Sequence, residues 1–509
     1  MLKKKKKLNP IVSFIFLTFI TIILSGILHL FNVQAEYSTV SKASDELVNN
    51  VIEVKNLFST SGIKHIITNA VSDFVNFSPL STLIIVLIGI GVLERSGFNR
   101  TAFTLMTKHS KKNTVTFTLI LTCLILSIVG DIGYAIMIPI GALLFKYGRR
   151  NPLGGIIATF ASLSFGTGIN LFLSANDSLL LTLTLNAART IDPKYNIGVF
   201  FSLFIMIVLL IVTAIVFTNI TEKKIMPKLP SYDIDEEEVV ITNKDLRGLI
   251  VGIGLGIIYL LIIIYMIIPG LPLSGGLLDN SATIYIDKLF GANSLFNKGF
   301  IFIVTMLFAI VGFGYGFMAK TIKNNKDVTE SLAYSLDNVG SIVVLIFFAS
   351  LFINTFNESN IGQVIVASFT KIINGIKFTG VPLILIILVL IAISNLVCPN
   401  SVAKWSILSA SIVPLMMNAS ISPEFSQIVY SAADTVTNGI TPLFTFFVVY
   451  IAFIEKYNKN NSTTIMGGIK YMTKYSIYSL IVWAIILVAW YMIGVPIGIG
   501  STPGVVYGA

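Results

Sequence analysis

Long hydrophobic runs separated by short polar segments follow one another along almost the whole chain. A helix needs about 20 apolar residues to cross the ~30 Å hydrocarbon core of a membrane. Runs of that order predict crossings at 11–31, 196–219, 248–268, 300–319, 330–356 and 475–497. The shorter run 79–94 suits a tilted crossing, and two longer ones, 152–189 and 423–456, are interrupted by polar, Gly- or Pro-containing breaks. The pattern predicts nine transmembrane helices.

Two further apolar stretches do not fit a simple crossing. Residues 114–147 and 381–418 each consist of two arms of about 14 residues around a polar tip, and such an arm extends only roughly 21 Å. Polar groups and irregular backbone persist at membrane depth only where protein or water surrounds them. We therefore expect two re-entrant hairpins, which makes the predicted fold class an all-α polytopic membrane protein.

The distribution of basic residues orients these elements. With the N-terminus, including Lys3–Lys7, in the cytoplasm and both hairpins returning to the side they enter, 25 of the 35 Lys and Arg residues are cytoplasmic. Nine are external, and Lys404 lies within the membrane. This is the bias that the positive-inside rule expects. The net charge of +10 then reflects membrane topology, so no nucleic-acid partner is predicted.

Composition agrees with a membrane protein and argues against an enzyme. The chain is 55% hydrophobic and 12% charged, against about 25% charged residues in soluble proteins. Its two cysteines form no CxxC pair, its three histidines form no cluster, and no cofactor motif or paired-carboxylate centre is present in the sequence. We predict a multi-pass protein of a cell membrane, surrounded by lipid.

The breaks and hairpins recur in two units. The first spans 79–220, with hairpin 114–147 and broken helix 152–189; the second spans 330–509, with hairpin 381–418 and broken helix 423–456. A first helix with an external segment (1–78) precedes them, and a linker with scaffold helices (221–329) separates them. A proline follows each hairpin, Pro152 in the first unit and Pro423 in the second. A second proline lies within each hairpin: Pro139 is eight residues after Asp131, and Pro414 is eight residues after Ser406.

The charge-derived topology opens the first hairpin to the cytoplasm and the second to the outside, so the units are predicted to be inverted. Inverted repeats with broken helices are typical of secondary transporters, whose site lies where the breaks converge. Half-helix N-termini there can face an anion, and freed carbonyls can face a cation. The alternative is two ordinary pairs of Pro-kinked helices. A passive channel would leave the hairpins unexplained.

Candidate cation ligands gather in the second unit and at one break of the first. Hard cations take oxygen ligands from carboxylates, amides, hydroxyls and carbonyls. This chemistry fits Na⁺, and H⁺ coupling is the alternative. Asn and Thr could instead cap the broken helix by bonding its free backbone groups. For Thr441, the roles of cation ligand and of cap are equally supported. The candidate ligands are Asn170, Asn395, Ser401, Asp434, Asn438 and Thr441.

Candidate substrate-binding residues are charged or aromatic residues whose presence within or beside apolar runs needs a functional reason. Asp177 is a carboxylate far inside an apolar run, and Asp131 at the first hairpin tip could reach the same cavity or cap the helix after it. Lys404 suits a substrate carboxylate, or a salt bridge to a nearby acid. Trp405 beside it suits stacking on an aromatic substrate, or packing. Asp434 could serve substrate as well as cation.

These stretches together resemble a known family. GDIGYAIMIPIGALLF, NPLGG, GINLFLSANDSLL and NLVCPNSVAKWSIL, followed by SPE and DTVTNGITPL, are similar to the AbgT family of bacterial transporters, over most of the chain. The resemblance implies homodimers of nine helices and two hairpins in the bacterial inner membrane. It also implies an elevator mechanism, a Na⁺ site near the hairpin and broken helix, and import of p-aminobenzoyl-glutamate or export of p-aminobenzoate and sulfonamides.

By motif, Asp177, Asn395, Trp405, Pro423, Asp434 and Asn438 match the family's functional positions. The chain departs from the pattern in three places. Val402 stands where the family usually has Ser, Ser431 where it usually has Arg, and 174–178 reads Ser-Ala-Asn-Asp-Ser where it tends to Gly-Thr-x-Asp-Pro. Losing Arg removes a bidentate carboxylate partner. We expect an ion-coupled transporter of a small carboxylated aromatic or dipeptide-like solute; the alternative is a dicarboxylate or other organic anion.

Overall fold

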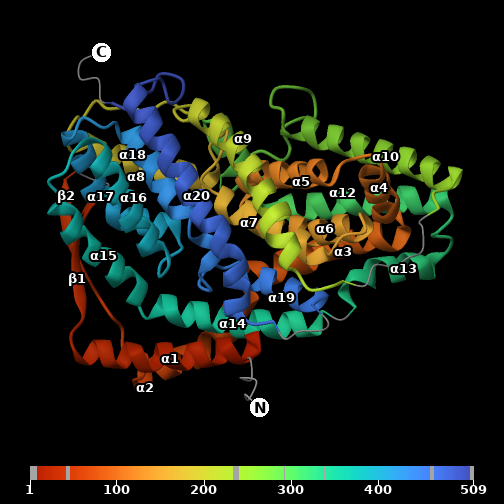
Figure 1. The fold of residues 1–509 in the computed structure, drawn as a ribbon, viewed down its shortest axis with the longest axis horizontal. Coiled ribbons are helices and arrows are strands. Elements are labelled where there is room, and N and C mark those ends of the chain that lie inside the picture. Colours follow the sequence, from red (N-terminus) through yellow and green to blue (C-terminus); the bar gives the residue numbers. More distant parts are fainter. Residues whose placement is uncertain are drawn as a thin grey trace.

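The chain folds almost entirely into helices (Figure 1). The computed structural model describes residues 8–41, 46–232, 240–291, 293–337, 339–458 and 463–504. The lysine run 3–7, which contributes to the predicted cytoplasmic N-terminus, and the acidic run 233–239 lie outside the described residues.

The elements follow one another without long gaps. Up to the first linker they are α1 Pro10–Leu30, β1 Gln34–Val40, β2 Leu47–Glu53, α2 Thr60–Val75, α3 Ser78–Ser96, α4 Phe98–Lys108, α5 Lys112–Leu126, α6 Asp131–Tyr147, α7 Pro152–Gly166, α8 Ala175–Arg189 and α9 Leu203–Ile220. After it come α10 Asn243–Ile267, α11 Tyr285–Phe290, α12 Leu295–Ala319, α13 Asn325–Ala333, α14 Gly340–Glu358, α15 Ile361–Asn374, α16 Gly380–Asn395, α17 Ser401–Asn418, α18 Pro423–Thr435, α19 Phe447–Tyr457 and α20 Ile465–Ile493.

The all-α prediction is wrong in one segment. β1 and β2 pair antiparallel, from Gln34 opposite Glu53 to Val40 opposite Leu47. This segment was expected to be a polar external connection. Its strands contain charged and polar residues, so hydrophobic and polar positions alternate only weakly along them. In the structure this ribbon lies against α15 and α17 (Figure 1), where the Thr370 hydroxyl donates to the Glu36 carbonyl at 3.2 Å.

The expected count of nine crossings is not reproduced one for one. Within the described ranges, eight helical segments are long and apolar enough to cross a membrane, and one of them, Lys112–Val129, is a predicted hairpin arm. The expected crossing 330–356 is divided, because α13 ends at Ala333 and α14 begins at Gly340. The two broken helices are too short in each half to be counted as crossings. The fold is therefore a mostly helical, multi-pass arrangement.

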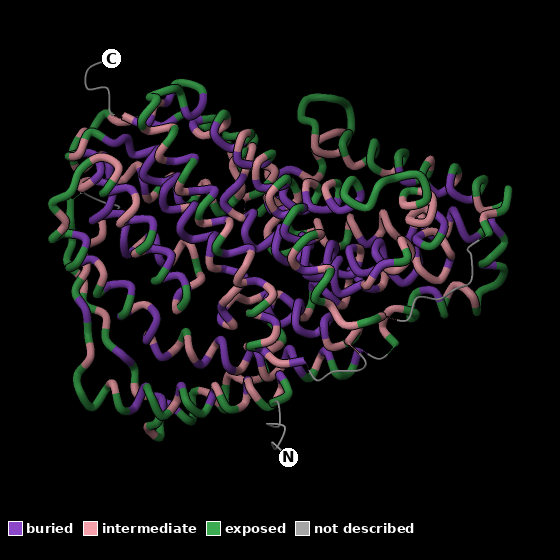
Figure 2. The backbone as a smooth tube through the Cα atoms, in the orientation of Figure 1, coloured by how far each residue is buried: buried purple, intermediate pink, exposed green. Residues whose placement is uncertain are grey.

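Both hairpin regions form two helical arms, and each is followed by a helix that ends early. α5 and α6 meet at a short 3-10 turn, Ser127–Val129, and α16 and α17 meet at residues 396–400. α7 packs against both arms of the first pair, and α18 against both arms of the second. All of α7, and all of α18 except Ser431, is buried (Figure 2). Both helices therefore lie in the packed interior, between the arms of their hairpin regions.

The two units share a register of 271 residues. Asn151 and Ser422 are side-chain N-caps of α7 and α18, directly before Pro152 and Pro423. Two residues before each cap the backbone is left-handed, with φ of 53° at Arg149 and 60° at Ser420. In this register, Gly168-Ile-Asn corresponds to Gly439-Ile-Thr.

Pro139 and Pro414 are not equivalent in this register, although their spacing from Asp131 and Ser406 suggested it. Pro139 lies 13 residues before Pro152, whereas Pro414 lies nine before Pro423. The starts of the second hairpin arms correspond more closely. α6 begins at Asp131 and α17 at Ser401, and this separation differs from the 271-residue register by one residue.

Residues related by this register touch each other at the two breaks. Thr167 corresponds to Asn438, whose Nδ2 donates to the Thr167 hydroxyl at 3.1 Å. Ser164 corresponds to Thr435, whose hydroxyl donates to the Ser164 carbonyl at 3.2 Å. The two helix breaks therefore meet face to face in the centre of the molecule.

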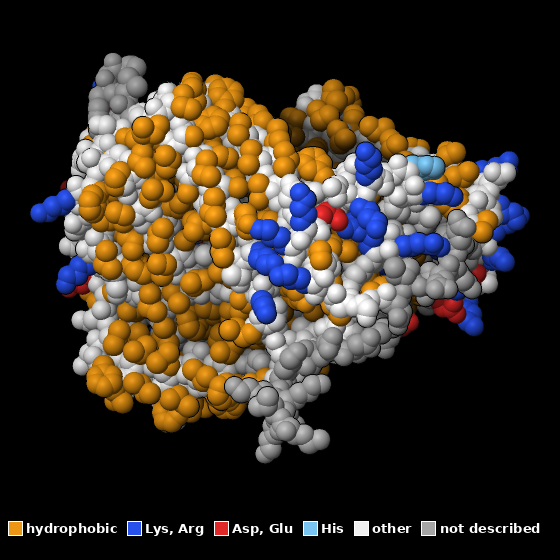
Figure 3. Space-filling model, in the orientation of Figure 1, with side chains coloured by type: hydrophobic (Ala, Val, Ile, Leu, Met, Phe, Trp, Pro, Cys, Tyr) orange, Lys and Arg blue, Asp and Glu red, His pale blue; other side chains and the backbone are white. Residues whose placement is uncertain are grey.

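Long apolar helices flank this core. α1 packs against α14, and α12 packs against both α3 and α10. α3 and α12 approach closely, because a Cβ at Gly89 would lie 2.8 Å from the Thr305 carbonyl oxygen. Figure 3 shows hydrophobic side chains over the broad face that includes α20, and Lys and Arg gathered toward the end that carries α4 and α13. Exposed apolar side chains on such a surface are suited to lipid.

Candidate substrate and cation site

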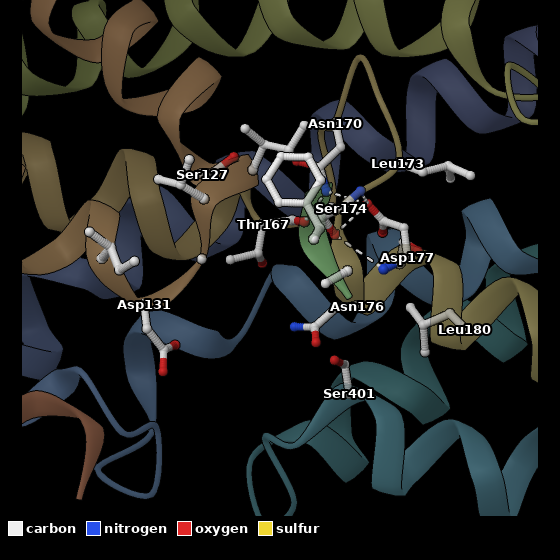
Figure 4. A pocket seen from close by; sticks show the side chains of 18 of the residues that line it. Ser127, Asp131, Thr167, Asn170, Leu173, Ser174, Asn176, Asp177, Leu180 and Ser401 are labelled. Carbon is white, nitrogen blue, oxygen red and sulfur yellow. Dashed lines mark hydrogen bonds between the residues drawn. The ribbon is translucent and has the colours of Figure 1, made fainter. Parts of the chain in front are cut away.

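A cavity of about 470 Å³ lies where the first break, the second hairpin tip and α12 come together. Its polar wall comes from the start of α6, the 167–177 segment, Ser401 and Asp434, and its apolar wall includes Phe296 and Phe300. Figure 4 shows Asp131, Asn176 and Ser401 approaching the same space from three different elements. The cavity size lies within the ~300–1,000 Å³ range of small-molecule sites.

Three helix N-termini border this cavity. α6 begins at Asp131, α8 at Ala175 and α17 at Ser401, and all three residues line the wall. Each N-terminus carries a partial positive charge from its free N–H groups and the aligned peptide dipoles. The starts of α8 and α17 have side-chain caps, whereas that of α6 follows Gly130 and has no side-chain cap. The arrangement favours a negatively charged group in the cavity.

Asp177 is held by its own helix start. Its carboxylate accepts from the Ser174 N–H at 3.0 Å and hydroxyl at 2.7 Å, and from Asn170 Nδ2 at 2.8 Å (Figure 4). The Ser174 hydroxyl accepts in turn from the Asp177 N–H at 3.1 Å, which completes a capping box. The Oδ1 atom of Asn170 is buried and has no hydrogen-bond partner among the described residues. It is therefore available to a ligand.

Asp131 lies in the first turn of α6 and is not its cap. The Ser78 hydroxyl, at the start of α3, donates to its carboxylate at 2.8 Å. This contact joins the first hairpin tip to a neighbouring long helix. Asp131 also lines the cavity, as one of its two predicted roles requires. It therefore contacts both the cavity and the start of α3.

Lys404 lies at the centre of a buried oxygen cluster. Its ammonium is 2.5 Å from Asp434 Oδ1, 2.5 Å from Asn395 Oδ1 and 3.3 Å from the Cys398 carbonyl. The Lys404 side chain is fully buried and the Asp434 side chain is 11% exposed. The expected alternative for Lys404, a salt bridge to a nearby acid, is thus what this arrangement contains. Asp434 lies between Lys404 and the cavity, because it also lines the cavity wall.

Asn395 connects this cluster to the second break. Its Nδ2 donates to the Asp434 carbonyl at 2.6 Å, to Thr437 Oγ1 at 3.0 Å and to Asn438 Oδ1 at 2.9 Å. Thr441 is engaged differently, since its hydroxyl donates to the Leu396 carbonyl at 2.8 Å and accepts from the Leu443 N–H at 3.3 Å. Of its two expected roles, Thr441 takes that of a backbone cap here.

Trp405 does not reach the cavity. Its side chain is fully buried, its Nε1 donates to Thr184 Oγ1 at 3.0 Å, and its ring lies 4.2 Å from that of Tyr430. One residue along a helix turns the side chain by about 100°. Because Lys404 faces Asp434, Trp405 faces α8 instead. Of the two roles expected for Trp405, stacking on substrate and packing, the structure shows packing.

The aromatic wall of the cavity was not anticipated from the sequence. Phe290, Phe296 and Phe300 lie on α11 and α12, in edge-to-face contacts with centroid separations of 6.1 and 5.3 Å. Phe300 is the first residue of the predicted crossing 300–319, and Phe290 and Phe296 precede it in the linker region. The i, i+4 spacing of Phe296 and Phe300 on α12 was the available signal, but such spacing is ordinary in an apolar helix.

Comparison with known proteins decides the family. The profile described as "AbgT putative transporter family" matches residues 5–505. The chain belongs to the AbgT family. The p-aminobenzoyl-glutamate transport protein of Escherichia coli K12 is 26% identical to this AbgT chain over 497 residues, 97% of the chain and 94% of the relative. Family membership makes it a membrane transporter rather than an enzyme.

Two solved AbgT-type structures are similar as well. The YdaH transporter of Alcanivorax borkumensis is 27% identical, covering 96% of this chain and 100% of its own, with a TM-score of 0.49. MtrF of Neisseria gonorrhoeae, from a class of antimetabolite efflux pumps, is 28% identical, covering 98% of each chain, with a TM-score of 0.49.

Ser431, where the sequence was expected to depart from the family, lines the cavity together with Asp434. The lining therefore contains Asp131, Asp177 and Asp434 but, among the described residues, no Lys, Arg or His. Lys404, behind Asp434, is the basic group directly bonded to that lining.

Proposed function

We propose that this protein is an ion-coupled secondary transporter of a small carboxylated aromatic solute. The observation that carries the proposal is the cavity itself, which is lined both by three helix N-termini and by Phe290, Phe296 and Phe300. A carboxylate placed at the N-termini would leave an attached ring against the phenylalanines. This division of the cavity fits an aromatic acid better than an aliphatic dicarboxylate.

The carboxylates in the wall do not prevent an anion from binding. The charge of Asp434 is balanced by Lys404. Asp177 accepts from Ser174 and Asn170, and Asp131 accepts from Ser78, so both carboxylates are hydrogen-bonded by neutral donors. We expect the substrate carboxylate to engage the N–H groups at the start of α6, which has no side-chain cap. The free Oδ1 of Asn170 is an acceptor, so we expect it to engage a donor group or a cation.

The coupling cation fits the oxygen cluster beside the cavity. Asn395 and Asp434 supply an amide and a carboxylate oxygen, and the Cys398 carbonyl points to the same place. Asn438 lies beside this cluster, where its Oδ1 accepts from Asn395 Nδ2. This is the donor chemistry of a hard monovalent cation such as Na⁺, with H⁺ as the alternative. A bound cation would add positive charge next to the substrate. Ser401 lies at the start of α17 and lines the cavity, so we assign it to the substrate.

The transport cycle follows from the two-unit architecture. We expect the units to be inverted and the hairpin and broken-helix core to move against α3 and α12 in an elevator-type motion. The direct contacts that must change include the Ser78–Asp131 hydrogen bond and the Phe296 wall. A homodimer in the bacterial inner membrane, with a cytoplasmic N-terminus, is part of the same proposal.

p-Aminobenzoyl-glutamate is the first substrate to test, because the E. coli relative transports it. p-Aminobenzoate and sulfonamides test the export alternative. The experiment is thermal unfolding of the purified protein with each compound, in NaCl and in choline chloride. Stabilisation by aromatic carboxylates, and not by succinate, supports the proposal. Stabilisation by succinate alone would replace it with a dicarboxylate transporter.

A further inference from the structure

The cavity has three carboxylates in its wall, whereas its proposed substrate is an anion. Within the described part of the chain, the basic group bonded to this wall is Lys404, which lies behind Asp434. We propose that Lys404 is a tethered cation: its ammonium fills the oxygen cluster in the state seen here, and it turns toward the cavity when a free cation occupies that cluster. This inference rests on the proposed function and deepens it.

The oxygen cluster suits a cation of charge +1 of either kind. Asp434 Oδ1 and Asn395 Oδ1 are both 2.5 Å from the ammonium, and the Cys398 carbonyl is 3.3 Å away. A carboxylate, an amide and a carbonyl are also the ligands of hard cations. Two positive charges cannot share this cluster at short range, because their repulsion is strong where solvent is excluded. Lys404 and a free cation therefore exclude each other.

Lys404 is placed to reach the cavity when it leaves the cluster. Ser401, one helical turn earlier on α17, lines the cavity, and residues three apart lie on one face of a helix. Side chains on a helix are tilted toward its N-terminus, which here is the end at the cavity. Asp434 both bonds to Lys404 and lines the cavity, so the ammonium lies one residue away from the cavity wall. A change of side-chain rotamer, with no movement of α17, would bring the ammonium to a substrate carboxylate.

The exchange links cation binding to anion binding. Ser431 in the cavity wall carries no charge, so it provides no permanent charged partner for the substrate. A released Lys404 ammonium would supply that charge only when a cation is bound. Each ligand then strengthens the other by the same factor, as linkage requires. Lys404 would be the residue that sets this coupling.

The test uses the full-length protein in detergent and Lys404→Met, which removes the charge and keeps the length of the side chain. Lys377→Met, an exposed lysine on the loop before α16, is the matched control. The Na⁺ concentration for half-maximal thermal stabilisation is measured at constant total salt, with choline as the replacement cation, and then with p-aminobenzoate present. Lys404→Gln serves as a second variant, because its amide can still donate to Asp434 and Asn395.

We expect the half-saturating Na⁺ concentration to fall about tenfold or more in both Lys404 variants and to stay unchanged in the control. Na⁺ should strengthen p-aminobenzoate binding in the wild type and not in Lys404→Met. An unchanged or higher half-saturating concentration in both variants overturns the exchange and leaves the proposed function intact. If the wild type ignores p-aminobenzoate while the variants gain Na⁺ affinity, the exchange stands and the proposed function fails.

Discussion

Replacing Asp434 by Ala should destabilise the protein strongly, because it leaves the Lys404 ammonium buried without its counter-ion. The Lys404 side chain is fully buried and the Asp434 side chain is 11% exposed, with 2.5 Å between their charged atoms. Breaking a buried pair by removing one partner costs about 3–5 kcal/mol. Asn395 and the Cys398 carbonyl would still accept from the ammonium, so we expect a value near the lower end.

The double variant Asp434→Ala/Lys404→Met separates this charge effect from simple truncation. Removing both members of a buried pair is often nearly neutral, so the double variant should recover about 2 kcal/mol or more relative to Asp434→Ala. The assay is reversible denaturant unfolding in mixed micelles, followed by the fluorescence of the three tryptophans. Asp287→Ala, at an exposed position on α11, is the control. A loss below about 1 kcal/mol in Asp434→Ala, with additive effects in the double variant, would refute the reasoning.

Three further substitutions probe separate parts of the site. Phe300→Ala removes part of the aromatic wall and should weaken aromatic carboxylate binding about tenfold, seen in the thermal-shift titration; unchanged affinity would remove Phe300 from the site. Asn438→Ala should abolish stabilisation by Na⁺ while folding is retained, and a normal Na⁺ response would exclude Asn438 as a ligand. Trp405→Phe breaks the hydrogen bond to Thr184 and should cost about 1–3 kcal/mol of stability, with ligand affinity changed less than about twofold. Loss of binding by a folded Trp405→Phe protein would place the indole in the substrate site.

Local backbone chemistry was the part of the fold most accessible from sequence. Asn151-Pro152 and Ser422-Pro423 predicted helix starts, and both are capped starts in the structure. The breaks at Gly168 and Gly439 were likewise visible as small polar groups within apolar runs. Such signals act within a few residues of their cause.

Equivalences across the two units were harder to predict. Pro139 and Pro414 lie at matching distances from Asp131 and Ser406, yet the register that pairs Pro152 with Pro423 does not pair Pro139 with Pro414. Two spacings that agree by chance cannot be told from homology without the packing. The β1–β2 ribbon was missed for a related reason: its pairing is a long-range property, and its polar strands carry little hydrophobic alternation.

Of the residues that line the cavity, several polar ones were singled out from the sequence, and the phenylalanines were not. Asp177, Asp131 and Asp434 were noticeable because carboxylates are rare inside apolar runs, and all three line the cavity. Phe296 and Phe300 gave no signal, because phenylalanine in an apolar helix is expected anywhere. Trp405 was assigned to substrate from its neighbour Lys404, although adjacent helical residues face different directions.

Counterflow in proteoliposomes tests the central claim most directly. Vesicles are loaded with unlabelled p-aminobenzoyl-glutamate, and entry of the labelled compound is followed with NaCl or choline chloride on both sides. The account predicts transient accumulation of label above equilibrium, lost with succinate as the internal solute and strongly reduced in Phe300→Ala. Equal accumulation with succinate, or none with any aromatic carboxylate in the panel, would contradict a site built from helix N-termini and an aromatic wall.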